Sequence, residues 1–269
     1  MIKNLSPLFS SFLCAGLLFS STVQAEQTPE QTAPKPPSLA KQVEGLLKKK
    51  PQLFDKAIQN YIENHPDIIY GALVKYQQQQ SQKQKDSVTS YMKENAKILF
   101  EDNKDGVLGN PNGNTTILVL SDYNCGYCRK AATALDEAIK TNPDLKVIIK
   151  QLPILGPDSN NAARVAMLAQ QKHMFKKVNQ ALLSMDKPMS KDKLIATVGK
   201  LGISQTEVEK AFSSSDFDSD IKQNYALAAK LMIQGTPALI ITNKDHSKIQ
   251  FIDNYLDQVE LKRAINSVK

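Results

Sequence analysis

The chain has 269 residues, of which 41% are hydrophobic, and carries 34 Lys and Arg against 27 Asp and Glu for a net charge of +7. That length is ample for a hydrophobic core and allows one large domain or two smaller ones. The positive charge is spread over single lysines, with Lys48-Lys49-Lys50 as the one run of three and no aromatic residues interleaved with it. This pattern favours a solvated helix end over a nucleic-acid site, and we expect no nucleic-acid partner.

Residues 1–25 have the layout of a secretory signal peptide. Lys3 precedes an apolar run from Leu8 to Phe19, and Val23-Gln24-Ala25 then offers a cleavage site before Glu26. A short membrane anchor is the alternative, but a spanning helix needs about 20 apolar residues and this run is shorter. We therefore expect an exported protein located in the periplasm, and association with the outer membrane is left open.

The next residues predict a tether followed by helices. Residues 26–37 hold four prolines and no large apolar side chain, which indicates a disordered tether. Residues 38–100 carry apolar side chains at helical spacing, and Pro51 and Pro66 each fit the first turn of a new helix. The last helix is predicted to run from about 66 to 100, because no proline or glycine interrupts its polar middle.

Such an amphipathic segment must bury its apolar stripe against another surface. We expect residues 38–100 to form a helical oligomerisation region that makes a homo-oligomer, with a dimer favoured. The alternative is that these helices pack back on the catalytic domain of their own chain.

A different pattern begins near residue 105 and opens a catalytic domain predicted over 101–269. Glycines and a proline between 106 and 113 indicate turns, and residues 115–120 are a continuous apolar and β-branched run, typical of a strand buried on both faces. A helical pattern then continues to Thr141, and residues 146–152 predict a second strand. Strand, helix and strand indicate a parallel βαβ unit, and therefore an α/β fold class.

The rest of the domain is predicted to be mostly helical. Residues 158–231 indicate an inserted domain of five helices, the fourth opened by a capping box from Ser204 to Glu207 and the fifth running from Ile221. Two short strands follow at 238–241 and 248–251, and one helix ends the chain.

The chemistry of the chain is expected at Cys125 and Cys128. Cys14 lies in the leader, so these two are the cysteines of the exported protein. A cysteine at the start of a helix meets free N–H groups and the positive end of the dipole, and Arg129 and Lys130 add nearby cations. Such settings lower a thiol pKa from about 8.5 to between about 3.5 and 7.5. We predict Cys125 as the nucleophile and Cys128 as the resolving thiol.

Other uses of the cysteine pair are open at this point. A zinc site would need further ligands, and the chain has no second such pair and scattered histidines at 65, 173 and 246. Thiolates also suit Cu(I). A structural staple over so short a loop removes little unfolded-state entropy. We expect no metal, and no cofactor beyond a redox-active Cys125–Cys128 disulfide.

Three segments together resemble the DsbA-like branch of the thioredoxin superfamily, over about residues 105–269. They are Cys125-Gly126-Tyr127-Cys128, the segment 151–156 with Ala162-Ala163-Arg164 after it, and Gly235-Thr236-Pro237. The resemblance implies a thioredoxin fold with a helical insertion and a cis Thr236–Pro237 bond facing the cysteines. It makes Gly126, Tyr127, Thr236 and Pro237 active-site or substrate-binding residues, with Thr236 binding an extended peptide. Residues 38–100 resemble the N-terminal oligomerisation region of a smaller group within this branch.

Two details resemble the DsbC-type isomerases, namely the Gly126-Tyr127 dipeptide and the threonine before Pro237. DsbA-like oxidases often carry an acidic residue six positions before the first cysteine, where this chain has Val119. Asp122 is the nearest acid, and its simplest role is to cap the helix at Cys125.

The resemblance thus implies a thiol–disulfide exchange enzyme, a protein disulfide oxidoreductase or isomerase that forms or isomerises disulfides in exported proteins. Its partners would be unfolded or misoxidised exported proteins and a membrane redox partner. The alternatives are a Cu(I)-binding thiol protein and an oligomeric holdase chaperone.

Overall fold

The computed structural model describes residues 38–269, so the expected leader and tether over residues 1–37 lie outside the described part. The chain divides into two compact units, Met1–Ile69 and Tyr70–Lys269. Within the described residues, no helix combines the length and the apolarity of a membrane span.

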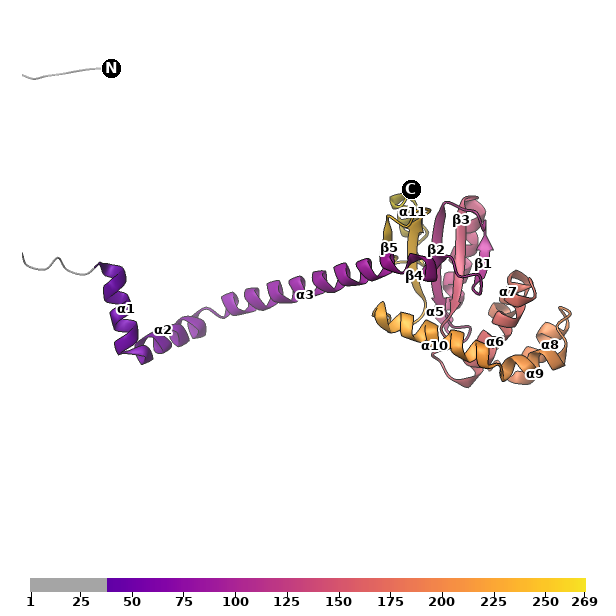
Figure 1. Cartoon of the computed structure of the whole chain (residues 1–269), viewed down its shortest axis with the longest axis horizontal. Helices are drawn as coiled ribbons and strands as arrows, with labels where there is room; N and C mark the ends of the chain where they lie inside the picture. Colours follow the sequence, from indigo (N-terminus) through magenta and orange to yellow (C-terminus); the bar gives the residue numbers. More distant parts are fainter. Residues whose placement is uncertain (1–37) are drawn as a thin grey trace, which may run out of the picture. The chain divides into compact units, whose positions relative to one another are not determined.

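The described part of the first unit, from residue 38, is helical and carries large apolar side chains on the outside. It holds α1 (Leu39–Lys49), α2 (Pro51–Asn64) and the first residues of α3 (Pro66–Glu94), with a proline opening the second and third helices as predicted (Figure 1). Neither α1 nor α2 buries a residue. Their exposed large apolar side chains are those of Leu39, Val43, Leu46, Leu47, Leu53, Phe54, Ile58, Tyr61 and Ile62.

The predicted continuous helix over 66–100 is interrupted at one residue. α3 ends at Glu94, and a short α4 (Ala96–Phe100) follows. Asn95 stands between them, with its backbone at φ −110° and ψ 20°, and its side-chain amide donates to the carbonyl oxygen of Tyr91 at 2.9 Å. A short polar side chain that bonds to nearby backbone in this way competes with the helical pattern.

A five-stranded sheet in the order β1-β3-β2-β4-β5 forms the centre of the second unit. β2 and β3 are parallel, which confirms the βαβ prediction, and the other neighbours are antiparallel, including the predicted hairpin of β4 and β5. The strands are β1 (Gly106–Gly109), β2 (Thr115–Ser121), β3 (Leu145–Gln151), β4 (Ala238–Asn243) and β5 (Ile249–Phe251).

Turns were predicted between residues 106 and 113. Residues 111 and 112 do turn, but Gly106–Gly109 form the edge strand β1, so the prediction was wrong there. A side chain at Gly106 would overlap the ring of Phe175, whose Cζ lies 2.1 Å from the position of a Cβ. Glycine is therefore needed there for close packing of the helix on the strand, and its presence did not signal a turn.

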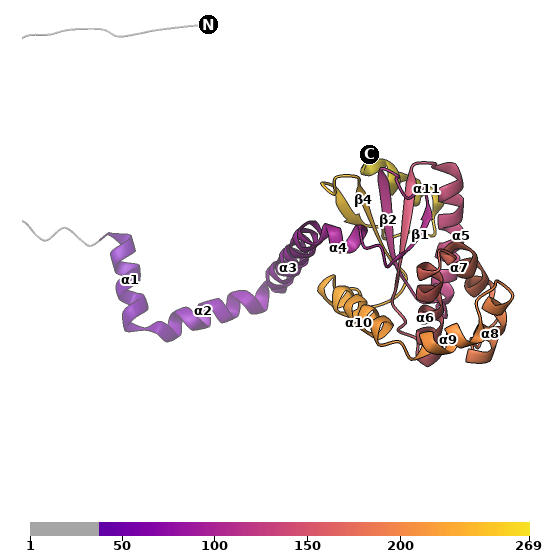
Figure 2. The ribbon, with the colours of Figure 1, turned by 45° about the vertical axis from the view of Figure 1, so that its right-hand side comes forward.

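Both faces of the sheet are buried. In β2, Ile117 and Val119 point into one core, which also receives α5 (Gly126–Thr141) and α11 (Gln258–Ser267). Leu118 and Leu120 point into the other core, with α4, the end of α3 and α10 (Ser215–Lys230). Figure 2 shows α4 and α10 on one side of the sheet and α5 on the other, which explains the unbroken apolar run of this strand.

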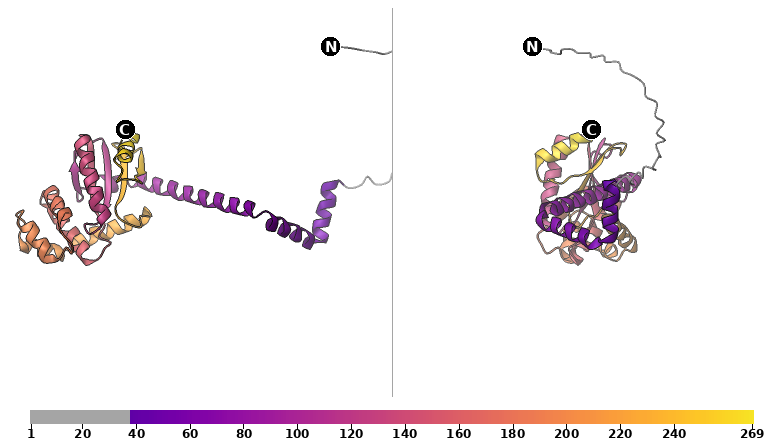
Figure 3. Two further views of the ribbon diagram at one scale, coloured as in Figure 1. Left: turned by 180° about the vertical axis from the view of Figure 1, so that it is seen from behind. Right: turned by 90° about the vertical axis from the view of Figure 1, so that its left-hand side faces the viewer.

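Five helices lie between β3 and β4, as predicted: α6 (Pro157–Gln171), α7 (Phe175–Ser184), α8 (Lys191–Gly199), α9 (Gln205–Phe212) and α10 (Figure 3). The capping box from Ser204 to Glu207 is present at the start of α9. The last helix starts at Ser215 and not at Ile221, because the Ser214 side chain accepts from the N–H of Phe217 and caps it.

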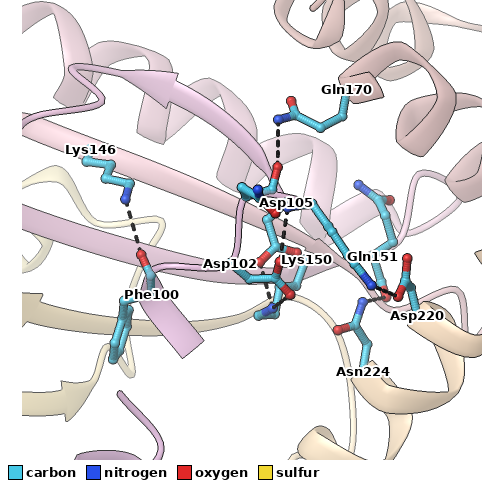
Figure 4. A network of polar contacts seen from close by, with 11 residues as sticks. Phe100, Asp102, Asp105, Lys146, Lys150, Gln151, Gln170, Asp220 and Asn224 are labelled. Atoms are coloured by element: carbon cyan, nitrogen blue, oxygen red, sulfur yellow. Dashed lines mark hydrogen bonds and ion pairs between the residues drawn. The ribbon is translucent and has the colours of Figure 1, made fainter. Parts of the chain in front are cut away.

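A buried lysine on β3 ties this strand to the segment before β1. The Lys150 ammonium lies 2.6 Å from the Asp105 carboxylate and 3.9 Å from that of Asp102 (Figure 4). Lys104, in the same segment, pairs with Asp220 of α10 at 2.7 Å. Burial raises the pKa of Asp105 to about 6, more than the charge and hydrogen bond of Lys150 lower it.

Candidate active site

Cys125 and Cys128 lie where the central strand gives way to a helix. β2 ends at Ser121, and α5 begins at Gly126 with Cys125 as its N-cap residue. The Cys125 sulfur accepts a hydrogen bond from the N–H of Cys128 at 3.4 Å, so the thiol itself caps the helix. Cys125 is 7% exposed and Cys128 2% exposed, and both are free thiols.

The two thiols have opposite pKa shifts. Burial raises the pKa of Cys125, but hydrogen bonds from the Cys128 N–H and the Thr236 side chain lower it by more than burial raises it. The resulting pKa of Cys125 lies below the ordinary value. Burial dominates at Cys128 and raises its pKa to about 12. Cys125 therefore loses its proton at a lower pH than Cys128. This order suits Cys125 as the nucleophile that attacks first, with Cys128 reacting in the second step.

The segment before β4 faces the first cysteine. The Thr236–Pro237 bond is cis, as the resemblance implied, and the Cys125 thiol lies 3.2 Å from the carbonyl oxygen of Thr236, to which it donates. Hydrogen bonding by the Thr236 side chain also lowers the pKa of Cys128. The structure thus brings together segments that are 111 residues apart in sequence.

Gly126 and Tyr127 form the exposed first turn of α5. The Tyr127 side chain is 61% exposed, and the Lys130 ammonium lies 5.6 Å from the centre of its ring. This cation–π contact holds the lysine over an aromatic face at the surface.

Arg129 was predicted to lower the pKa of the thiols as a nearby cation, but its contacts indicate a different role. Its guanidinium donates to the carbonyl oxygens of Tyr123 at 3.1 Å and Met185 at 2.6 Å, and to the sulfur of Met189 at 3.7 Å. Burial and hydrogen bonds are the main influences on the pKa of Cys125, so Arg129 instead fastens the start of α5 to the segment after α7.

Asp122 does not cap α5, so its simplest predicted role was wrong. Its carboxylate accepts from the N–H groups of Asn124 at 2.8 Å and Leu155 at 2.9 Å, and the residue is 1% exposed. Its own N–H donates to the sulfur of Cys128 at 3.5 Å. Asp122 therefore joins the cysteine turn to the segment after β3.

Two further features of the site carried no sequence signal. Lys187, next to a cis bond to Pro188, donates from its ammonium to the carbonyl oxygen of Asn124, which precedes Cys125. A cavity of about 20 Å³ adjoins Cys128, lined among others by Val119 and Ser121. This volume is enough for about one water molecule.

A family model described as a DSBA-like thioredoxin domain matches residues 116–261, which is more than half of the chain. It spans both cysteines and the Thr236–Pro237 segment. No curated protein matches the chain by sequence.

Solved structures share the fold over nearly their whole length. A thioredoxin-like oxidoreductase from Silicibacter pomeroyi DSS-3 is 27% identical, with a TM-score of 0.58, and covers 64% of this chain and 95% of its own. BcfH from Salmonella enterica Typhimurium is 21% identical, with a TM-score of 0.69 and coverages of 84% and 99%. A periplasmic thioredoxin-like protein from Salmonella enterica serovar Typhimurium is 25% identical, with a TM-score of 0.54 and coverages of 64% and 94%.

Proposed function

The chain belongs to the DSBA-like thioredoxin domain family and is a thiol–disulfide oxidoreductase, and we propose that it exchanges disulfides with exported proteins through Cys125 and Cys128. The observation that carries this proposal is the geometry of the pair, since Cys125 caps the start of α5 and its sulfur lies 3.2 Å from the carbonyl oxygen of Thr236, just before the cis Pro237. The pKa values of the two thiols agree with it. Cys125 has a lowered pKa at the start of α5, while the pKa of Cys128 is raised to about 12.

In the proposed reaction, the Cys125 thiolate attacks one sulfur of a client disulfide. A mixed disulfide forms between Cys125 and the client, and the other client sulfur leaves as a thiolate. When Cys128 then attacks Cys125, the client is released reduced and the pair becomes a disulfide. When a different thiol of the client attacks the client sulfur of the mixed disulfide instead, the client leaves with a rearranged disulfide and Cys125 leaves as a thiolate.

We favour isomerisation over net oxidation. The Gly126-Tyr127 dipeptide and Thr236 resemble the isomerase pattern, and Val119 stands where DsbA-like oxidases often carry an acidic residue. Thr236, whose carbonyl oxygen lies at Cys125, and the cis Pro237 after it would bind the backbone of an extended client segment. The clients would be unfolded or misoxidised proteins, and a membrane partner would restore the pair.

A periplasmic location is part of the proposal. It is supported by the signal-like sequence of residues 1–25. It is also supported by the thioredoxin-like Salmonella protein of 25% identity, which is described as periplasmic. Disulfide exchange also suits that compartment, because exported proteins form their disulfides there.

We further propose that the first unit makes the protein a homo-oligomer, with a dimer favoured. The support is that α1 and α2 bury no residue although they carry a stripe of large apolar side chains. Sedimentation equilibrium of the full exported chain tests this. A Leu46→Glu, Ile58→Glu variant should be monomeric, while Gln52→Glu, which adds charge at a polar position, should not change the mass. A monomeric wild-type protein would contradict the proposal.

The activity is tested by reactivation of a scrambled multi-disulfide ribonuclease, beside Cys125→Ala. Reactivation that depends on Cys125 would establish isomerisation. Fast oxidation of reduced ribonuclease without reactivation would make the protein an oxidase. Failure of both assays would contradict exchange at this pair.

A further inference from the structure

The environment of the Cys128 sulfur decides how a mixed disulfide is resolved. Burial raises the pKa of this thiol to about 12, so its thiolate is costly to form. The N–H of Asp122 donates to the sulfur at 3.5 Å. Such a donor stabilises the thiolate more than the thiol, because hydrogen bonds to charged acceptors are stronger than those to neutral ones.

The Asp122 side chain fixes the position of that N–H group. Its two carboxylate oxygens accept from different segments, one from Asn124 in the cysteine turn and the other from Leu155 after β3. Both bonds are charge-assisted, so rotation of the Asp122 backbone would cost at least one of them.

The segment that carries Leu155 is itself anchored to α10. The Tyr225 hydroxyl donates to the carbonyl oxygen of Pro153 at 2.6 Å, and the Asn224 amide donates to that of Gln151 at 3.0 Å. The Asp122 carboxylate is therefore held from the side of a packed helix as well as from the cysteine turn.

Two other roles fit these contacts less well. The N-cap role is filled by Cys125, whose sulfur accepts from the N–H of Cys128. A general base would need a carboxylate oxygen at the Cys128 thiol, whereas the contact there is the Asp122 N–H and both oxygens are bonded to other amides.

We propose that Asp122 is a positioning residue for the resolving step, in which its side chain holds its own N–H group against the Cys128 sulfur. Water takes the proton from Cys128, and the thiolate attacks Cys125 in the mixed disulfide. The new Cys125–Cys128 bond forms as the bond to the client sulfur breaks, and that sulfur leaves as a thiolate and is protonated by solvent. The client disulfide gains two electrons and the cysteine pair loses two. This inference rests on the proposed function, because both cysteines must react.

The test follows both steps in the full exported chain with excess dithiobis-nitrobenzoate. The first thionitrobenzoate release reports attack by Cys125, and the second reports resolution by Cys128. In Asp122→Ala we expect the first rate to stay within about twofold and the second to fall roughly tenfold or more, since a tenfold change corresponds to about one charged hydrogen bond. The mixed disulfide should then accumulate and be visible by mass spectrometry.

A second variant and a matched control keep the test decisive. Asp122→Asn keeps the side-chain shape and one acceptor but presents an amide donor to a second backbone N–H, so it should also slow the second release selectively. In both variants, the pH profile of the second release should shift to higher pH, because the Cys128 thiolate is harder to form. Glu137→Gln removes the same charge from an exposed position on α5 and should leave both rates unchanged.

The outcomes separate the inference from the function on which it rests. Equal slowing of both releases, or no slowing of the second, in a folded Asp122 variant would overturn the positioning role. If Asp122→Ala does not fold, the same criteria apply to Asp122→Asn, and misfolding of both variants would also overturn it by assigning Asp122 to stability. Retention of the fast first release in Cys125→Ser would instead contradict the proposed function.

Discussion

The sulfur of Cys125 and the carbonyl oxygen of Thr236 lie 3.2 Å apart because the strands that precede and follow them are paired. β2 leads into the cysteine turn, and β4 begins just after the cis proline. Their antiparallel register places Leu120 opposite Ala238. The geometry of the site is thus set by the central strand pair of the sheet.

Thr236→Val should weaken the acidity of Cys125. The substitution keeps the side-chain shape but removes the hydroxyl, whose hydrogen bonding lowers the pKa of both cysteines. We expect the pKa of Cys125 to rise, because a hydrogen bond that favours the thiolate is lost. Ultraviolet absorbance of the thiolate against pH measures it. Thr133→Val, at an exposed position on α5, is the control, and an equal shift there would remove Thr236 as the cause.

Alkylation at neutral pH should be selective for one cysteine. Because the pKa of Cys125 is lowered and that of Cys128 is raised to about 12, iodoacetamide should modify Cys125 at least about a hundredfold faster. Peptide mapping after a short exposure gives the two rates. Selectivity should vanish in urea, where both thiols have ordinary surroundings. Comparable rates in the folded protein would contradict the asymmetry.

Arg129→Met should reduce stability and leave thiol acidity unchanged. The variant keeps an unbranched aliphatic stem but loses the guanidinium, which donates to the carbonyl oxygens of Tyr123 and Met185. We expect the free energy of unfolding to fall by about 2 kcal/mol, measured by urea titration, since bonds from charged donors contribute about 1.5–3 kcal/mol. Lys130→Met is the matched control and should be near neutral. A raised pKa of Cys125 in Arg129→Met, with stability unchanged, would restore the role expected from sequence.

Asp105→Asn should remove a pH dependence of stability. The pKa of Asp105 is raised from 3.8 to about 6 by burial, despite Lys150, with Asp102 and Asp220 adding to the shift. The folded state therefore binds the extra proton, and the stability from this group is full below about pH 4 and is lost as pH rises to about 6. Wild type and variant should be similar near pH 4, and the variant more stable near pH 7 by about 1–3 kcal/mol.

Urea titrations of both proteins between about pH 4 and 7 give this difference directly. If Asp105→Asn were instead less stable than the wild type near pH 7, the ion pair with Lys150 would outweigh the cost of burying the carboxylate.

Patterns that repeat within a few residues were sufficient for most of the fold. The apolar run of β2, the helical spacing of the insertion and the capping box at Ser204 are local signals, and the structure confirms the elements that they predicted. β1 was missed because the reason for Gly106 lies in Phe175, which is distant in sequence. The break at Asn95 was missed because one polar residue hardly changes a long helical pattern.

The site divides in the same way. The cysteine spacing and the cis proline carried signals that could be found from sequence. The contacts of Arg129, Asp122 and Lys187 could not be found, because each joins backbone groups whose partners are set by tertiary packing. A charge near Cys125 in sequence was therefore a poor guide to the charge near its sulfur.

The alternation of β2 between two cores also limits how this domain can change length. Its odd-numbered residues fill one core and its even-numbered residues the other, and the cysteine turn follows at once. One inserted residue would exchange the two sets and advance the turn by about 3.3 Å, away from Thr236. The number of residues from Thr115 to Cys125 should therefore stay constant among descendants that keep this chemistry. Insertions and deletions should instead accumulate in the connections between α6 and α10.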